Sequence, residues 1–248
     1  MHADAPPSGE GTGGRPPARR GAIIAPVVAT TGTVTAIGEA RPGSARYTVS
    51  IEGRPAVVLS AEAIAEVGVR LGTALDPALA ARLSEAALHV AVFDRAVALL
   101  AMRGRTGREL CLRLRRAGAP PGAIDGAMAR LQALGALDDE ALARRVAESR
   151  LGAGAVSRRL LKAELQRRGV ARAAAEAAVE AAATEVGHDE EAAARALAER
   201  RLRSLRGEDA LTRRRRLQGF LARRGFASGV IARVVRALVI AADDGDAG

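Results

Sequence analysis

The sequence predicts a mainly α fold, with three tandem three-helix repeats preceded by a small β-rich N-terminal segment. Two observations predict it. A template of Leu-x-x-x-Leu-x-Arg-basic/small-Gly, with apolar residues six and ten positions after the Gly, occurs three times. A further stretch with helical spacing precedes each copy. Tandem repetition of this kind is typical of proteins that present an extended binding surface rather than one catalytic pocket.

The three copies of the template share their residue types and spacing. Their glycines are 51 and 56 residues apart, which is longer than the common two-helix repeats. The template positions are Leu110, Leu114, Arg116, Gly118, Ile124 and Met128; then Leu161, Leu165, Arg167, Gly169, Ala175 and Val179; then Leu217, Leu221, Arg223, Gly225, Ile231 and Val235.

Each copy predicts two helices joined at its glycine. The paired leucines lie four residues apart, which puts them on one helix face. The glycine follows a basic last turn, as expected of a C-cap that adopts the left-handed conformation. The apolar residues after the glycine continue at helical spacing into a second helix. A preceding helix is expected at about 85–103, 139–151 and 189–205, which makes each unit a three-helix repeat.

Capping residues support these helix starts. Thr106 and Glu109 form the pattern of a capping box at the start of the second helix of the first repeat. Asp138 and Asp139 stand where the next helix begins, and acidic side chains suit its positive end.

The β-rich segment is predicted to have three strands. Alternating apolar residues and turn signals place them at 33–37, 46–51 and 56–59. Ser60 is then expected to cap a helix over 61–67. Asp76 followed by Pro77 indicates a further helix start.

The expected organisation follows from these elements. A Pro- and Gly-rich composition predicts a disordered tail at the N-terminus, and the single cysteine, Cys111, is typical of a reducing cytoplasm. The predicted parts are a tail at 1–30, a β-hairpin and helix extension at 31–80, repeats at 81–137, 138–186 and 187–241, and a flexible tail at 242–248.

The net charge of +10 is concentrated in three runs, at 103–116, 157–172 and 213–224. They carry +5, +5 and +6, which together exceed the charge of the whole chain, so the remainder is net acidic. Each run lies on the second helix of a repeat. If the repeats stack in one orientation, the runs form a basic stripe suited to a polyanion, either nucleic acid or an acidic protein surface.

The candidate partner-binding residues are the basic side chains of these runs. With one Tyr, three Phe and no Trp in the chain, recognition by base stacking is disfavoured, while phosphate or protein contact stays open. The candidates are Arg103, Arg105, Arg108, Arg115, Arg116, Arg158, Arg159, Lys162, Arg167, Arg168, Arg213, Arg214, Arg215, Arg216, Arg223 and Arg224.

The sequence offers no catalytic, cofactor-binding or metal-binding set. The histidines His2, His89 and His188 lack ligand spacing. The only lysine, Lys162, is not part of a nucleotide-binding loop. Asp138 and Asp139 are interpreted as helix caps, so no nucleophile and base are paired.

The chain resembles the RecX family, regulators of the RecA recombinase, from about residue 33 to 238. Three motifs carry the resemblance. Residues 103–110 are similar to the family's R-x-R-[ST]-x-x-E-L, residues 131–139 to R-L-x-x-L-G-x-[IL]-D-D, and residues 220–226 to F-L-x-R-R-G-F. The chain departs from the family in having Leu142 and Val146 where aromatic residues are usual.

The resemblance implies an elongated, curved array that lies in the groove of the RecA filament on single-stranded DNA. There it would inhibit ATP hydrolysis, filament extension and strand exchange, and so modulate recombination and DNA repair. A cytoplasmic monomer without enzymatic activity, cofactor or membrane contact is expected. The alternative is a basic helical-repeat protein that binds single- or double-stranded DNA directly.

Overall fold

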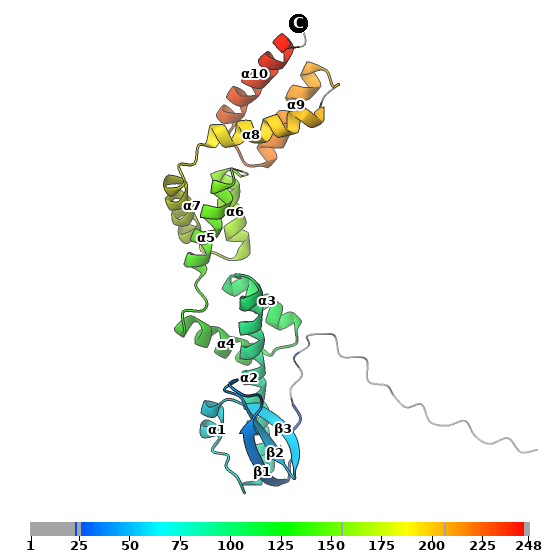
Figure 1. The fold of residues 1–248 in the computed structure, drawn as a ribbon, viewed down its shortest axis with the longest axis vertical. Helices are drawn as coiled ribbons and strands as arrows, with labels where there is room; N and C mark the ends of the chain where they lie inside the picture. The colour runs from blue at the N-terminus through cyan, green and yellow to red at the C-terminus, as the bar shows by residue number, and fades with distance from the viewer. Residues whose placement is uncertain (1–22, 24–25, 155, 206, 246–248) are drawn as a thin grey trace, which may run out of the picture. The chain divides into compact units, whose positions relative to one another are not determined.

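The computed structural model describes residues 1–248 except 1–22, 24–25, 155, 206 and 246–248 (Figure 1). The chain forms two compact units. The first comprises the residues up to Leu88 together with Ala117–Ala119, and the second comprises His89–Arg116 and the residues from Pro120 onward. The first unit holds the sheet, and the second holds most of the first repeat and all of the second and third.

The sheet has four antiparallel strands in the order β3-β2-β1-β4. The strands are β1 (Gly32–Glu39), β2 (Tyr47–Ile51), β3 (Arg54–Leu59) and β4 (Ala74–Leu75). Val34, Val49 and Leu59 are buried, as the alternation predicts. The expectation of three strands was wrong by one, because two-residue β4 pairs with Gly32 and Thr33 and is too short to carry an alternating pattern.

Helix α1 (Ala61–Val67) confirms the predicted cap at Ser60. The Ser60 hydroxyl accepts a 3.2 Å hydrogen bond from the amide of Ala63. At the other end of α1, the Arg82 guanidinium donates to the carbonyls of Glu66 and Val67. These contacts satisfy main-chain groups that a short helix leaves without partners.

Helix α2 (Pro77–Met102) begins where the sequence predicted, with a carboxylate of Asp76 accepting a 2.7 Å bond from the amide of Leu79. Eight further α-helices and a 3₁₀ turn follow in the described residues. They are α3 (Gly107–Arg116), α4 (Pro121–Ala133), α5 (Asp139–Gly152), α6 (Arg158–Arg168), α7 (Arg172–Glu185), α8 (Glu190–Leu202), η1 (Arg203–Leu205), α9 (Ala210–Arg223) and, in addition, α10 (Ser228–Gly245).

The template residues form the core of the repeats. The paired leucines of all three copies are at most 1% exposed. The apolar residues that follow the glycines are buried as well, except for half-buried Met128. The mainly α fold with helical repeats is therefore confirmed.

The predicted caps of the repeats are also confirmed. Gly118, Gly169 and Gly225 have φ of +89°, +105° and +81°, the left-handed region that a side chain disfavours. The capping box of α3 is complete, because the Thr106 hydroxyl accepts from the amide of Glu109 at 3.2 Å and the Glu109 carboxylate accepts from the amide of Thr106 at 3.1 Å.

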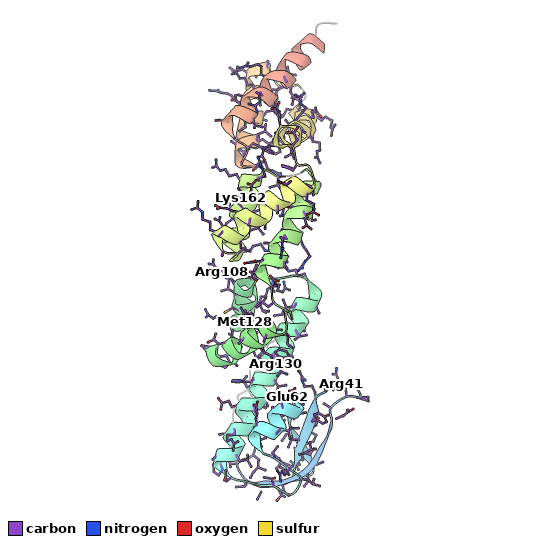
Figure 2. All side chains as sticks on the ribbon, turned by 90° about the vertical axis from the view of Figure 1, so that its left-hand side faces the viewer. Arg41, Glu62, Arg108, Met128, Arg130 and Lys162 are labelled. Atoms are coloured by element: carbon purple, nitrogen blue, oxygen red, sulfur yellow. The ribbon has the colours of Figure 1, made fainter. Side chains whose placement is uncertain are left out.

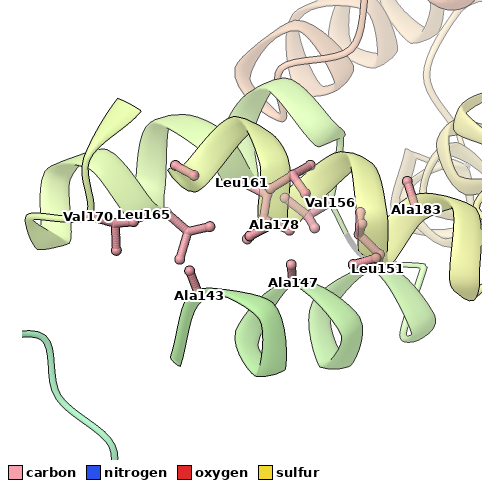
Figure 3. Packing of buried hydrophobic residues seen from close by; sticks show 12 residues of the cluster. Ala143, Ala147, Leu151, Val156, Leu161, Leu165, Val170, Ala178 and Ala183 are labelled. Carbon is pink, nitrogen blue, oxygen red and sulfur yellow. The ribbon is translucent and has the colours of Figure 1, made fainter. Parts of the chain in front are cut away.

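The core of the second repeat is rich in alanine (Figure 3). Ala143 and Ala147 of α5 are fully buried and face the larger side chains of the neighbouring helices, such as Leu165. Small side chains let α5 and α7 approach closely. They also bury little apolar area per residue, so packing in this repeat contributes less stability than leucine-rich packing would.

Successive repeats of the second unit are joined by equivalent contacts. The Thr106 hydroxyl donates a 2.5 Å hydrogen bond to the carbonyl of Arg168, at the end of α6. One repeat later, the Ser157 hydroxyl donates a 2.8 Å bond to the carbonyl of Arg224, at the end of α9. In the first and second repeats, the hydroxyl at the start of the second helix thus binds the C-terminal end of the second helix of the following repeat.

The predicted terminal tails overlap described structure. The Ile23 amide donates a 2.7 Å bond to the carbonyl of Ala117, and Val28 is buried, although both fall within the expected tail at 1–30. Residues 1–22 and 24–25 of that tail lie outside the described residues. At the C-terminus α10 continues to Gly245, and only 246–248 of the expected tail lie outside.

Candidate partner-binding surface

The three basic runs lie on or beside the second helices α3, α6 and α9. Figure 2 shows two of the predicted residues, Arg108 on α3 and Lys162 on α6. The environments of the basic side chains differ between the repeats. These environments determine which basic side chains are accessible to a binding partner.

In the first repeat, four of the five candidates are exposed: Arg103, Arg108, Arg115 and Arg116. None of these four forms an ion pair within 4 Å among the described residues. Basic side chains in the last turn of α3 also complement the carbonyl end of the helix.

Arg105, the fifth candidate, is buried, and only 6% of its surface is exposed. Its Nε and Nη1 atoms have no hydrogen-bond partner among the described residues. Burial, followed by the charges of Arg103 and Arg113, lowers the pKa of Arg105, while Glu109 opposes the change. The expectation that Arg105 belongs to an exposed stripe is therefore not met, and its place is inside the repeat.

In the second repeat the basic run is largely paired with acidic residues. Arg158 bonds to Glu190 at 3.1 Å and to Glu180 at 3.2 Å, and Lys162 bonds to Glu180 at 2.6 Å. The hydrogen bond to Lys162 is the main reason that the pKa of Glu180 is lowered, and the bond to Glu190 is the main reason that the pKa of Arg158 is raised. Much of the charge predicted for this part of the stripe is thus neutralised within the repeats.

Arg168 is committed to the joint with the first repeat. Its guanidinium donates two hydrogen bonds to the Glu109 carboxylate, at 3.0 and 3.2 Å. Burial of Glu109 favours its neutral form, but the bonds from Arg168 and from the Thr106 amide outweigh burial and lower the pKa of Glu109. Of this run, Arg159 and Arg167 remain exposed without an ion pair among the described residues.

In the third repeat the basic residues are mostly exposed. Arg214, Arg215 and Arg223 are exposed and form no ion pair among the described residues. Arg213 is half-buried, and Arg216 pairs with Glu208. The Arg224 guanidinium lies over the ring of Phe220, 5.2 Å from its centre, so it packs as well as carrying charge.

Two grooves of the second unit contain these basic residues. One, of about 560 Å³, is lined by α6, α7 and residues at the starts of α8 and α10, and it contains Glu176, Glu180 and Glu190 beside its basic residues. The other, of about 410 Å³, belongs to the third repeat alone. Its described lining residues are Arg201, Arg215, Arg216, Gly219 and Arg223.

Sequence reasoning missed the acidic partners and part of the second groove. Glu180 and Glu190 lie on different helices from the arginine they bind, so spacing along one helix could not reveal the pairing. Arg201 lies on α8, outside the three runs. The unusual position of Gly219 within a helix was the one local signal that could have pointed to the groove.

The described residues hold no grouping of three or more metal-ligating side chains. They likewise include no helix long and apolar enough to cross a membrane. The repeats present a charged surface on which exposed arginines gather on α3 and α9.

The repeats match a known family. A family model for the third three-helix domain of RecX matches residues 189–235. Regulatory protein RecX of Streptomyces coelicolor is 40% identical over 144 residues, which cover 57% of this chain and 75% of the relative. Regulatory protein RecX of Thermobifida fusca is 39% identical over 138 residues, covering 56% and 73%.

Solved structures agree on the fold. A crystal structure of regulatory protein RecX matches 82% of this chain and 98% of its own, with a TM-score of 0.66 at 20% identity. RecX from Lactobacillus salivarius matches 61% of this chain and 97% of its own, with a TM-score of 0.50 at 17% identity. From its repeats, and from the identity and coverage of these relatives, the chain belongs to the RecX family of regulatory proteins.

Proposed function

We propose that this protein binds the RecA recombinase, as monomer or as filament on single-stranded DNA, and inhibits its ATP hydrolysis, filament extension and strand exchange. The support is the family, whose relatives are named regulatory proteins, and the resemblance of its motifs to regulators of RecA. The observation that carries the proposal is the presentation of exposed arginine on the equivalent helices α3 and α9 of the first and third repeats.

Repetition suits a polymeric partner. Once one repeat is bound to a filament, the next contacts form at high effective concentration, so weak individual contacts add up to useful affinity. Inhibition then follows from occupancy and needs no chemistry in the regulator. We accordingly propose a non-enzymatic role in the cytoplasm.

A pair of matched variants tests this role for the basic surface. Arg115 and Arg116 are adjacent and exposed on α3, and Arg144 and Arg145 are adjacent and exposed on α5, outside the three runs. The double change Arg115→Gln and Arg116→Gln should raise the concentration needed to half-inhibit RecA by about tenfold, equivalent to about 1.4 kcal/mol. The same change at Arg144 and Arg145 removes equal charge and should have little effect.

The two double variants are compared by RecA ATPase inhibition, after circular dichroism shows that both are folded. An equal loss of inhibition in the two would mean that net charge alone matters and that the second helices are not the contact surface.

Direct DNA binding without RecA is the alternative function. Arg214, Arg215 and Arg223 of α9, which are exposed and form no ion pair among the described residues, support it. A DNA-binding protein would bind bare DNA with a steep dependence on salt and leave RecA activity unchanged. A RecA regulator would inhibit DNA-dependent ATP hydrolysis.

A further inference from the structure

The third repeat contains a groove lined by arginine. Packing of the repeat's core does not require this groove. Arg215, Gly219 and Arg223 succeed one another every four residues along α9, so they lie on one face of the helix. Arg201, from the last turn of α8, and Arg216 complete the lining. No acidic residue is among the described residues that line it.

Gly219 is the most informative member of the groove. Glycine inside a helix is unfavourable relative to alanine because it loses more backbone freedom on folding. A Cβ placed at Gly219 would meet only the Nη1 atom of Arg223, at 3.3 Å, which is the mobile end of a side chain. No core neighbour requires glycine here, so its effect is to leave space between the arginines.

The arginines of the lining also cluster positive charge. Arg215 and Arg216 are adjacent in α9, and Arg216 alone of the α9 arginines in the lining has an acidic partner among the described residues, Glu208. A helix-interior glycine and clustered positive charge, neither of them required by packing, are expected where a protein binds a ligand. Guanidinium groups converging on one space suit a phosphate group, which they bind through paired N–H donors.

The lining favours a nucleic-acid backbone over a protein surface. A protein contact usually has an apolar or aromatic centre, whereas the described lining residues of this groove are arginine and glycine. The nearby ring of Phe220 is half-buried and lies beneath Arg201 and Arg224, at 5.9 and 5.2 Å from their guanidinium carbons. Arginine side chains therefore already pack on this ring.

We propose that this groove is a phosphate site for the backbone of single-stranded nucleic acid, with Arg215 and Arg223 as the principal contacts. The contact would be with the sugar-phosphate backbone, because guanidinium groups suit phosphate oxygens and no aromatic side chain that could stack on a base is among the described lining residues. It would also exist without RecA, which gives the protein a nucleic-acid contact of its own beyond the regulatory role proposed above.

The test is fluorescence anisotropy of the full-length protein with a labelled oligothymidylate, measured over a range of salt concentrations. Arg215→Gln and Arg223→Gln should each weaken binding by about threefold to tenfold and reduce the salt slope by about 0.7, the value for one phosphate contact on a single strand. Arg214→Gln is the matched control, since Arg214 is exposed, unpaired and adjacent but does not line the groove. Equal losses for Arg214→Gln and Arg215→Gln would overturn the proposal.

A second variant keeps the helix intact. Gly219→Glu places a carboxylate in the groove and a better helix former in α9, so binding should fall while thermal stability does not. Ala232→Glu, at an exposed position of α10, makes the same charge change outside the groove and should bind nearly normally. Unchanged binding by Gly219→Glu would contradict the assignment.

Other occupants give different results. If pyrophosphate or ATP competes as well as the oligonucleotide at equal ionic strength, the site is one for free phosphate compounds and not for a nucleic-acid strand. If Arg215→Gln weakens binding to RecA in the absence of DNA but not to the oligonucleotide, the groove is a protein contact. Either result would overturn the nucleic-acid assignment.

Discussion

The hydroxyl of Ser157 donates a 2.8 Å hydrogen bond to the main-chain carbonyl of Arg224, which lies 67 residues away in the chain. The same hydroxyl accepts from the amide of Leu160 and so caps α6. Thr106 does both for α3, with Arg168 as the acceptor. In each case one buried hydroxyl caps the helix that it precedes and also binds the following repeat.

The third repeat lacks the equivalent donor. Thr106 and Ser157 each stand twelve residues before the glycine of their repeat, and the corresponding position in the third is Arg213. Helix α9 begins earlier, with Asp209 as its cap. The buried hydroxyl therefore joins the first repeat to the second and the second to the third, whereas Asp209 caps α9 in its place.

The first prediction concerns the Ser157 hydroxyl. Ser157→Ala should reduce the free energy of unfolding by about 2 kcal/mol, because it removes a helix cap and leaves the partly buried carbonyl of Arg224 without its donor. Ser157→Thr keeps the hydroxyl and should cost much less, as the natural threonine at the equivalent position implies. Urea denaturation followed by circular dichroism measures both, with exposed Ser149→Ala as the control. Equal costs for the alanine and threonine changes would show that the hydroxyl contributes nothing.

The second prediction concerns the glycine that admits this contact. A Cβ at Gly225 would lie 2.6 Å from the Ser157 hydroxyl oxygen and 2.9 Å from the Cβ of Leu160. Gly225→Ala should therefore combine backbone strain with overlap and cost about 3 kcal/mol. Gly135 also has a positive φ, +65°, but a Cβ there meets nothing within 4 Å. Gly135→Ala should cost only the strain, about 1 kcal/mol. Similar losses of stability would contradict the close packing at Gly225.

The third prediction concerns pH. The pKa of Glu109 is lowered in the folded protein, so its charge stabilises the fold above the ordinary pKa and that contribution is lost as the pH falls through the folded value. Glu109→Gln should be less stable than the original protein by about 1 to 2 kcal/mol near pH 7. The gap should shrink below about pH 4.

Thermal unfolding at a series of pH values checks this, with Glu140→Gln at an exposed position as the control. A difference between Glu109→Gln and the original protein that stays constant from pH 7 to pH 3 would refute the role of the Glu109 charge.

The fourth prediction concerns the neutralised run of the second repeat. Lys162 pairs with Glu180, and Arg158 pairs with both Glu180 and Glu190. Changing Glu180→Gln therefore frees Lys162 on the surface and leaves Arg158 bound to Glu190. Half of the Glu180 side chain is exposed, so stability should change by less than about 1 kcal/mol. Inhibition of RecA should become stronger if unpaired charge on α6 is what contacts the partner. Unchanged inhibition would place the contact on the other repeats.

Local chemistry made much of the fold predictable. The paired leucines, the left-handed glycines and the Thr106–Glu109 capping box depend on neighbours within one or two turns, and all are confirmed. The fourth strand, β4, was not predicted, and the reason is not local. Ala74 and Leu75 pair only because the fold brings them beside β1, and two residues leave no pattern in the sequence.

The binding surface was less predictable than the fold. Charge counting placed the basic runs on the correct helices but could not show that Glu180 neutralises two of their members or that Arg105 is buried. Both depend on contacts between helices. Likewise Ser157, which holds the second and third repeats together, looks in the sequence like an ordinary polar residue.

The central claim, that this repeat protein inhibits RecA by occupancy, is tested most directly by RecA-catalysed ATP hydrolysis on single-stranded DNA with increasing amounts of this protein. We expect hydrolysis to fall at protein concentrations below that of RecA, because one bound molecule limits the growth of a filament. Hydrolysis that stays constant up to an excess of the protein over RecA would contradict the account, and salt-sensitive binding to bare DNA under the same conditions would then favour the DNA-binding alternative.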